Sequence, residues 1–404
     1  MAATFRERLL ALQPLDLAAS LPLLQSHFPE LAVLSRVPAD GAGRSLLEHT
    51  QQVLELVRVR ARDLSLQRAR TLYLAALVHD LGRGSIPDGR RRSAGTAMAR
   101  DLLRRLEITP WQRDHVVYLA RSHDLAFVSG RRSVSVGRML RLAWTLDTYL
   151  LYLLGVADCR ADGARAALRC QALEAFRERC LQLGVLGRQP APLLPKARWE
   201  ELAPKDRWLR RRIAGEGRLW RLKGKLSTAE EAEAWLKAYQ PSPAGTLYLP
   251  VGVPGSGKTT WVAKNLQGVP VVSMDEMRER LLGSRSDQSR NPEVYHLSRA
   301  ALAEALRAGE RVVWDAQSHT WDARYGLLTL AREHHAYVIT IYFDVPLAVA
   351  LERNLRRKEV VPEEVIVRNY GRMEEPRPFE AEEVWRVDAD GRCARYRWDE
   401  SVGL

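Results

Sequence analysis

The sequence predicts a multidomain protein with an all-α helical bundle in its N-terminal half and an α/β domain with a parallel sheet in its C-terminal half. Its 404 residues exceed the size of one typical domain. Apolar residues recur at three- and four-residue spacing over residues 5–186, whereas short apolar runs alternate with helical stretches after Gly245. The chain is 46% hydrophobic and 27% charged, which excludes disordered, collagen-like and low-complexity classes. We expect an all-α domain at 1–186, a junction at 187–244 and an α/β domain at 245–404.

The N-terminal segment is predicted to consist of helices. Residues 72–81 place apolar side chains at helical spacing, and Pro110 is expected to open a helix because proline is tolerated in the first turn. Residues 142–157 are too few for a bilayer core and include Asp147, so we expect a buried core helix there. The charged start MAATFRERLL does not resemble a secretory signal. We therefore expect a cytoplasmic protein that has no contact with a membrane.

The junction is rich in Pro, Arg and Trp, and it ends in one predicted amphipathic helix, STAEEAEAWLKAY. Its cations alternate with Trp199, Trp208 and Trp220, a combination that suits single-stranded nucleic acid, because bases stack on indole rings while Arg contacts phosphates. The net charge of +13 also favours a polyanionic partner. Two alternatives remain open. The tryptophans would equally join two domains, and an Arg-rich composition gives the same charge without a nucleic-acid partner.

Four short apolar runs are predicted to form the strands of the C-terminal domain. They are TLYLPV, PVVSM, RVVWD and YVITIYF, and the helical stretches between them give the βαβ pattern of a parallel sheet. The tail EEVWRVDADGRCARYRW is predicted to form two strands at the sheet edge, joined by a turn at Asp390 and Gly391.

One segment matches a phosphate-binding motif in full. Residues 252–259 read GVPGSGKT, the pattern GxxxxGK[ST], and they lie between an apolar strand and a predicted helix. Glycines let successive backbone N–H groups surround a β-phosphate, Lys258 bridges the β- and γ-phosphates, and the Thr259 hydroxyl binds Mg²⁺. The sequence therefore predicts a site for ATP and Mg²⁺ formed by Gly252, Gly255, Ser256, Gly257, Lys258, Thr259 and Thr260.

Charged residues follow the predicted strands, at the edge where α/β folds bind ligands. Asp275 is placed to accept the proton of an attacking hydroxyl, and Arg278, one turn later, to hold a neighbouring phosphate. Asp315 ends RVVWD and is the natural second carboxylate near the metal. A basic group in LERNLRRKE suits a lid over the triphosphate and comprises Arg353, Arg356 and Arg357. The simpler alternatives are a helix-capping Asp, a turn Asp and a solvated basic helix face.

The segments SMDEMR, WDAQSH and RNLRR, followed by VVPEEVI, resemble the polynucleotide 5′-kinase branch of the P-loop phosphotransferases over most of residues 245–404. The resemblance implies that Asp275 is the general base for a 5′-hydroxyl and that Arg278 holds the adjacent nucleotide phosphate. It also implies that Arg353 and Arg357 belong to a lid over ATP. Such kinases commonly read Asp-x-Thr-Asn where this chain has Asp-Ala-Gln-Ser at 315–318, so the resemblance retains Asp315 and assigns no role to the serine.

Histidine and aspartate residues recur along the N-terminal domain. His79 and Asp80 end an apolar helix, His49 lies about thirty residues earlier, and Asp158 lies far downstream. Imidazoles and carboxylates from three helices suit one divalent transition-metal ion, and water bound to such an ion becomes a nucleophile for a phosphoester. Taken singly, each histidine is more often an exposed or satisfied core residue.

The ordered set of these residues resembles the HD phosphohydrolase superfamily over about residues 25–170, and it comprises His49, His79, Asp80, His115, His123 and Asp158. The resemblance implies an HD-domain helical bundle with these residues at its metal site. In bimetallic members another His usually precedes the next helix, where this chain has Arg90, Arg91 and Arg92. The superfamily's HDxGK reads HDLGR here, so Arg83 supplies the phosphate contact as a planar fork.

An HD module followed by a polynucleotide-kinase-like module resembles, in domain order over nearly the whole chain, the bacterial HD-Pnk end-healing enzymes. The resemblance implies that the kinase transfers the ATP γ-phosphate to a 5′-hydroxyl. It also implies that the HD module removes a 2′,3′-cyclic phosphate or a 2′- or 3′-phosphate. The expected partners are RNA or DNA ends, ATP and a separate ligase. Two alternatives remain open, namely a P-loop kinase of a small metabolite and a degenerate HD domain that senses a nucleotide and regulates the kinase.

Overall fold

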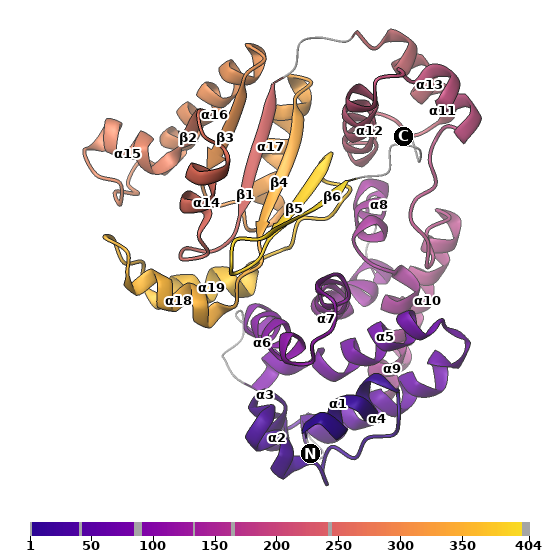
Figure 1. Cartoon of the computed structure of the whole chain (residues 1–404). Helices are drawn as coiled ribbons and strands as arrows, with labels where there is room; N and C mark the ends of the chain where they lie inside the picture. Colours follow the sequence, from indigo (N-terminus) through magenta and orange to yellow (C-terminus); the bar gives the residue numbers. More distant parts are fainter. Residues whose placement is uncertain are drawn as a thin grey trace. The chain divides into compact units, whose positions relative to one another are not determined.

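The computed structural model describes residues 2–39, 43–84, 91–131, 134–162, 166–240 and 245–397. The chain divides into two compact units, Met1–Ala191 and Pro192–Leu404. The first unit is helical and the second carries a sheet (Figure 1). The predicted fold class, an all-α unit followed by an α/β unit with a mostly parallel sheet, is confirmed.

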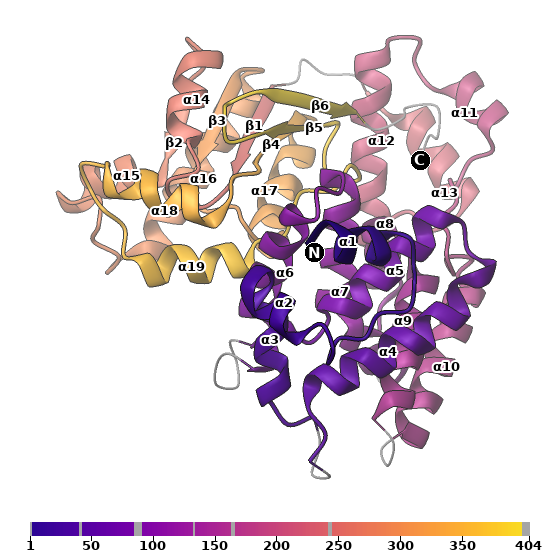
Figure 2. The same ribbon diagram turned by 60° about the horizontal axis from the view of Figure 1, so that its bottom comes forward.

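The helices of the first unit have these bounds: α1 Ala2–Leu10, α2 Leu21–His27, α3 Pro29–Ala32, η1 Val33–Arg36, α4 Leu46–Arg60, η2 Ala61–Asp63, α5 Leu66–Val78, η3 Leu81–Gly84, α6 Arg91–Arg105, α7 Pro110–Arg131, α8 Val136–Thr145, α9 Thr148–Ala161 and α10 Ala166–Gln182. Helix α4 packs against α5 and α9, and α7 packs against α5 and α9, so these four helices form the centre of the unit (Figure 2). Because His49, His79, His123 and Asp158 lie on these four helices or at their ends, the packing of the bundle brings them together.

Local sequence signals explain where the central helices begin. Ser45 accepts a hydrogen bond from the N–H of Glu48 and the Glu48 carboxylate accepts one from the N–H of Ser45, a reciprocal cap that starts α4. Pro110 is the first residue of α7, as predicted. Residues 142–157 are not one helix as predicted, because Asp147 accepts hydrogen bonds from the N–H groups of Tyr149 and Leu150, which ends α8 and starts α9. None of the helices in the described part of the chain is long and apolar enough to cross a bilayer.

The elements of the second unit have these bounds: α11 Lys196–Leu202, α12 Arg207–Leu222, α13 Ala229–Ala238, β1 Thr246–Val251, α14 Lys258–Asn265, β2 Val271–Ser273, α15 Met274–Leu282, α16 Asn291–Arg307, β3 Arg311–Asp315, α17 Trp321–Glu333, β4 Tyr337–Phe343, α18 Leu347–Leu355, α19 Glu363–Arg372, β5 Glu383–Val387 and β6 Cys393–Arg397. The strand order is β2-β3-β1-β4-β5-β6, and the pairs are parallel except for β5 with β6. The four predicted parallel strands and the antiparallel pair at the edge are therefore confirmed.

The predicted junction contains more structure than its sequence indicates. Residues 196–238 form three helices within the second unit, and Trp199 is fully buried in a small core with Leu194, Ile213 and Leu236. The ring of Trp208 stacks on that of Tyr337, with centroids 3.5 Å apart. Helix α12 turns arginines inward as well as apolar residues, and Arg211, Arg212, Arg218 and Arg221 are all buried. Arg218, for example, is buried and donates to the carbonyl of Phe379.

Candidate metal centre and phosphate-binding loop

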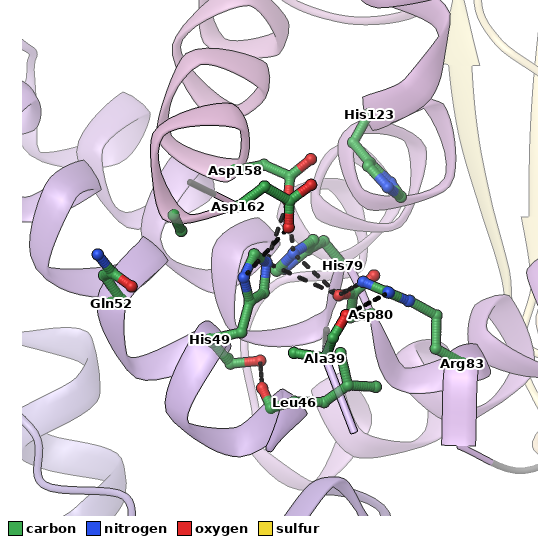
Figure 3. A network of polar contacts seen from close by, with 12 residues as sticks. Ala39, Leu46, His49, Gln52, His79, Asp80, Arg83, His123, Asp158 and Asp162 are labelled. Carbon is green, nitrogen blue, oxygen red and sulfur yellow. Dashed lines mark hydrogen bonds and ion pairs between the residues drawn. The ribbon is translucent and has the colours of Figure 1, made fainter. Parts of the chain in front are cut away.

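Three helices bring the predicted metal ligands of the first unit together. His49 comes from the first turn of α4, His79 from the end of α5 and Asp158 from the last turn of α9 (Figure 3). The Nε2 atom of His49 lies 3.1 Å from Oδ1 of Asp158, and Nε2 of His79 lies 3.7 Å from the same oxygen. All three side chains are buried. Their donor atoms lie within 4.8 Å of one another, which is close enough to share one cation.

Asp80 lies at the edge of the same group. Its Oδ2 is 3.5 Å from Nε2 of His79 and 3.8 Å from Nε2 of His49. Arg83 donates from Nη1 to this oxygen at 2.8 Å, so the predicted phosphate-binding residue is held beside the cluster by Asp80. The four ligands predicted for one divalent cation are thus collected in one place.

The hydrogen bonds of His79 fit a metal ligand. Its Nδ1 donates to the carbonyl of Ala76 at 2.8 Å, so Nε2 is the nitrogen that faces the two carboxylates, and that buried atom has no hydrogen-bond partner among the described residues. Burial lowers the pKa of His79, but the carboxylates of Asp80 and Asp158 outweigh it and raise the pKa to about 9. Burial likewise raises the pKa of Asp158, yet its contacts with His49 and His79 hold it well below its usual range. Two buried carboxylates that stabilise a positive charge on the imidazole suit a cation in place of that proton.

Of the two histidines predicted on α7, only His123 lies near the cluster. Its ring centroid is 5.4 Å from that of His79, and its Nδ1 is bonded to the carbonyl of Ala120 in the same way that His79 is bonded to Ala76. His115 contacts Trp111 through its ring and is bonded to the Trp111 carbonyl. The two histidines are eight residues apart, a rise of about 12 Å along the helix. The sequence had predicted His115 at the metal site, but the structure does not bring it to the cluster.

Two residues that the sequence analysis did not identify complete the surroundings of the cluster. Asp162 lies one turn after Asp158, and its Oδ1 is 3.7 Å from Nδ1 of His49. Arg169, on α10, donates to Asp158 at 2.7 Å and also pairs with Asp162. The spacing of Asp158 and Asp162 was a usable signal, since residues four apart share a helix face. The position of Arg169 had no such signal.

A cavity of about 1240 Å³ opens beside the cluster. His79, Asp80, His123 and Asp158 line it, together with three arginines, Arg83, Arg121 and Arg169. Arg90 lies outside the described residues, and Arg91 and Arg92 begin α6 with side chains that are not described. A cavity that joins a cation site to several guanidinium groups is suited to phosphate esters.

The predicted phosphate-binding loop follows β1 in the second unit. Gly255 and Gly257 have φ angles of 80° and 91°, and α14 begins at Lys258. A Cβ atom on Gly255 would lie 2.1 Å from the carbonyl oxygen of Ala350, so only glycine fits there. The Lys258 ammonium donates to the carbonyls of Gly252 and Val253 at 2.9 and 3.0 Å. The loop thus has the turn conformation that its motif predicts.

The side chains at the start of α14 differ in exposure. Ser256 is buried, whereas Thr259 and Thr260 are exposed in the first turn of the helix, where hydroxyl groups are accessible to a cation and phosphate. Burial lowers the pKa of Lys258 to about 8, although the charges of Asp315 and Asp275 oppose this shift. Burial also raises the pKa of Asp315. The lysine and the two carboxylates therefore interact at one edge of the sheet.

The register of the strands explains why Asp275 and Asp315 lie at the same edge of the sheet. Ser273 of β2 pairs with Asp315 of β3, so Asp275, two residues further on, follows the strand end beside Asp315. Asp275 forms an ion pair with Arg278, whose Nε also donates to Asn291 at 2.9 Å. The side chain of Asp275 is 66% exposed, so a bulky acceptor is able to reach it. The predicted base and the predicted phosphate-holding arginine are direct neighbours.

Part of the basic group at the end of α18 lies beside the phosphate-binding loop. Arg353 donates to the carbonyl of Ala389 at 2.6 Å and approaches Gly257. Arg357 is exposed just after α18, and its charge lowers the pKa of Lys258. Arg356 pairs with Glu352 on the outer face of the helix. Arg353 and Arg357 therefore lie on the side of the loop, and Arg356 fits the alternative of a solvated charge.

Comparison with known proteins identifies a domain in each unit. A family model described as an HD domain matches residues 46–143, and one described as an AAA domain matches residues 247–376. The L-seryl-tRNA(Sec) kinase of Methanococcus maripaludis is 26% identical over 138 residues, which are 32% of this chain and 53% of that protein. The chain thus spans about half the length of this curated relative. It combines an HD domain with a P-loop domain of kinase type.

Proposed function

We propose that the chain is a bifunctional enzyme that heals the ends of broken RNA or DNA. Its P-loop domain phosphorylates a 5′-hydroxyl with ATP and Mg²⁺. Its HD domain removes a 2′,3′-cyclic phosphate, or a 2′- or 3′-phosphate, with a divalent transition metal. The observation that carries the proposal is that one chain holds a P-loop motif around Lys258 and, in its other unit, a cluster of candidate metal ligands around Asp158.

In the kinase half, the exposure of Asp275, the proposed general base, supports a polynucleotide acceptor. Lys258 and the loop N–H groups bind the β- and γ-phosphates, and the Thr259 hydroxyl and Asp315 are the candidate ligands of Mg²⁺. Asp275 accepts the proton of the attacking hydroxyl, and Arg278 beside it binds the phosphate of the next nucleotide. A small-metabolite kinase has more use for a closed acceptor site than for a base that is 66% exposed.

In the HD half, the fit of the ligand cluster supports turnover rather than mere sensing. His49, His79, Asp80 and Asp158 would hold the ion, which supplies an acidic water when bound. Arg83 lies beside the cluster with exposed guanidinium surface, so it is placed to bind a phosphate oxygen. A degenerate sensor has no need for four buried ligands that remain in contact.

The proposal is tested with one oligonucleotide that carries a 5′-hydroxyl and a 2′,3′-cyclic phosphate. It is incubated with the full chain, ATP and a panel of divalent metals, and both ends are analysed. We expect a 5′-phosphate and a free 2′,3′-diol or 2′- or 3′-monophosphate end. Retention of the cyclic phosphate with every metal would refute the phosphoesterase half, and retention of the 5′-hydroxyl would refute the kinase half.

A second acceptor class is favoured by the matched relative, which is named as a kinase of seryl-tRNA(Sec). A hydroxyl carried on an aminoacylated RNA would reach the same exposed Asp275. Labelled ATP offered with seryl-tRNA, a 5′-hydroxyl oligonucleotide and free serine separates the three classes. Label on the oligonucleotide alone supports end healing, and label on free serine alone supports a small-metabolite kinase.

A further inference from the structure

The cavity beside the metal-ligand cluster has two chemically different zones. One zone is polar and holds the cluster with the arginines Arg83, Arg121 and Arg169. The other zone is apolar, and its lining comprises Phe127, Ala167 and Leu168. A phosphate and a metal-bound water need the first zone alone. The second zone indicates that the ligand also has an apolar part.

Helix α7 joins the two zones along one face. Ala120, His123 and Phe127 all line the cavity and follow one another at three- and four-residue spacing. The ring of His123 lies 5.4 Å from that of His79. Phe127 is therefore one helical turn beyond a residue that contacts the cluster.

The apolar zone is separated from the cluster by the width of one guanidinium group. The Cζ atom of Arg169 lies 5.6 Å from the ring centroid of Phe127, while its Nη2 is 2.7 Å from Asp158. Leu168, the neighbour of Arg169, is 65% exposed. Leu168 and Phe127 both line the cavity, so together they offer apolar surface to a ligand that enters it.

We propose that Phe127 and Leu168 form a base-binding subsite of the HD cavity. The subsite takes the terminal nucleobase of a single-stranded end whose 2′,3′-phosphate lies at the cluster, and this inference rests on the phosphoesterase activity proposed above. Stacking on an aromatic ring accepts every base, because each base has a π-face. The volume of about 1240 Å³ accommodates a terminal nucleoside together with its phosphate.

Phe127 has a second conceivable role, which the experiment must separate from the first. If its ring were needed to support Arg169, which holds Asp158, removal of the ring would disturb the cluster itself. Loss of such support would change kcat and the bound metal for every substrate. Loss of a stacking platform would raise KM only for substrates that carry a terminal base.

The experiment compares two oligonucleotides with the same 2′,3′-cyclic phosphate, one of which lacks the terminal base. Wild-type protein, Phe127→Leu and Phe127→Trp are assayed as full chains, and the bound metal is measured for each. We expect the wild-type KM to be about tenfold lower for the base-carrying end, in keeping with the strength of base stacking on aromatic rings. Phe127→Leu should abolish this difference without changing kcat on the abasic end, and Phe127→Trp should restore it.

A second pair of variants tests the other wall of the subsite. Leu168→Ala should raise KM for the base-carrying end by about threefold, as one aliphatic contact is lost. Leu66→Ala changes another exposed leucine, on α5 and outside the cavity lining, and should change nothing.

Three results would overturn the inference. Equal wild-type KM values for the two ends would remove the subsite. Equal losses of kcat and metal in Phe127→Leu on both ends would assign Phe127 to the support of Arg169. If metal-loaded wild type cleaved neither end, the proposed phosphoesterase activity would fail first and the subsite with it.

Discussion

The two candidate sites of this chain are built in opposite ways. The metal-ligand cluster combines buried side chains from α4, α5 and α9, and His49 and Asp158 are 109 residues apart in the sequence. The phosphate loop is one contiguous segment, residues 252–260, and it presents mainly backbone groups. The comparison shows that the first site depends on helix packing across the whole unit, whereas the second depends on the local conformation of a few glycines.

The largest effect should come from removing a side chain of the first site. Asp158→Ala deletes the carboxylate that both histidines contact, so phosphoesterase activity should fall by about a thousandfold or more and bound metal should be lost. The two-ended assay and metal analysis measure this. Kinase activity is the internal control, and its loss in a folded Asp158→Ala protein would contradict the separation of the sites.

Substitution of Lys258 should abolish the kinase activity of the second site alone. Lys258→Ala removes the ammonium that bridges phosphates, so 5′-phosphorylation should fall by roughly a hundred- to a thousandfold, as when one preorganised charge is removed from an active site. Phosphoesterase rate and metal content should stay at their wild-type values. A parallel loss of both activities would show that the sites are coupled.

A glycine substitution should damage the phosphate loop through its backbone. Gly255→Ala places a methyl group 2.1 Å from the Ala350 carbonyl oxygen at a φ of 80°, which should cost more than about 2 kcal/mol and abolish ATP binding. Gly268→Ala is the matched control, because its φ is 72° but no atom lies within 4 Å of the added methyl group. Chemical denaturation and ATP titration distinguish the two. Equal destabilisation in both variants would mean that φ strain alone sets the cost.

A smaller effect should follow from a carboxylate that surrounds the first site without lying in it. Asp162→Asn removes the negative charge 3.7 Å from Nδ1 of His49, so metal affinity should weaken by about tenfold. Metal titration checks this, with the exposed Asp63→Asn on η2 as the control. Unchanged affinity in Asp162→Asn would exclude Asp162 from the orientation of His49.

The smallest effect should be a pH dependence of ATP binding at the second site. Burial lowers the pKa of Lys258 to about 8, below its value in the unfolded chain. The folded chain therefore binds fewer protons than the unfolded chain between pH 8 and the unfolded pKa, and the Lys258 contribution to stability rises with pH across that window. ATP favours the charged lysine, so its affinity should fall several-fold between pH 7 and pH 9. Lys258→Arg, which does not titrate there, should show no such fall, and an equal fall would assign the effect elsewhere.

The sequence alone determined the features that depend on neighbouring residues. The strands, the loop at 252–259 and the first residue of α7 were predictable, because hydrophobic periodicity, glycine and proline act over a few positions. The break at Asp147 was missed, since its capping competes with a strong apolar periodicity. The burial of Trp199 was also not predictable, because the apolar residues that cover it come from three segments.

Only the tertiary structure decided which distant side chains meet. His123 and His115 were equivalent in the sequence, yet helix geometry brings one to the cluster and leaves the other beside Trp111. Arg169 and Phe127 came to lie beside the cluster through the packing of α7, α9 and α10. Local spacing states which residues share a helix face, but the rotation and approach of whole helices is set by how their apolar faces pack. For that reason the phosphate loop was predictable from the sequence, whereas most of the residues around the metal ligands were not.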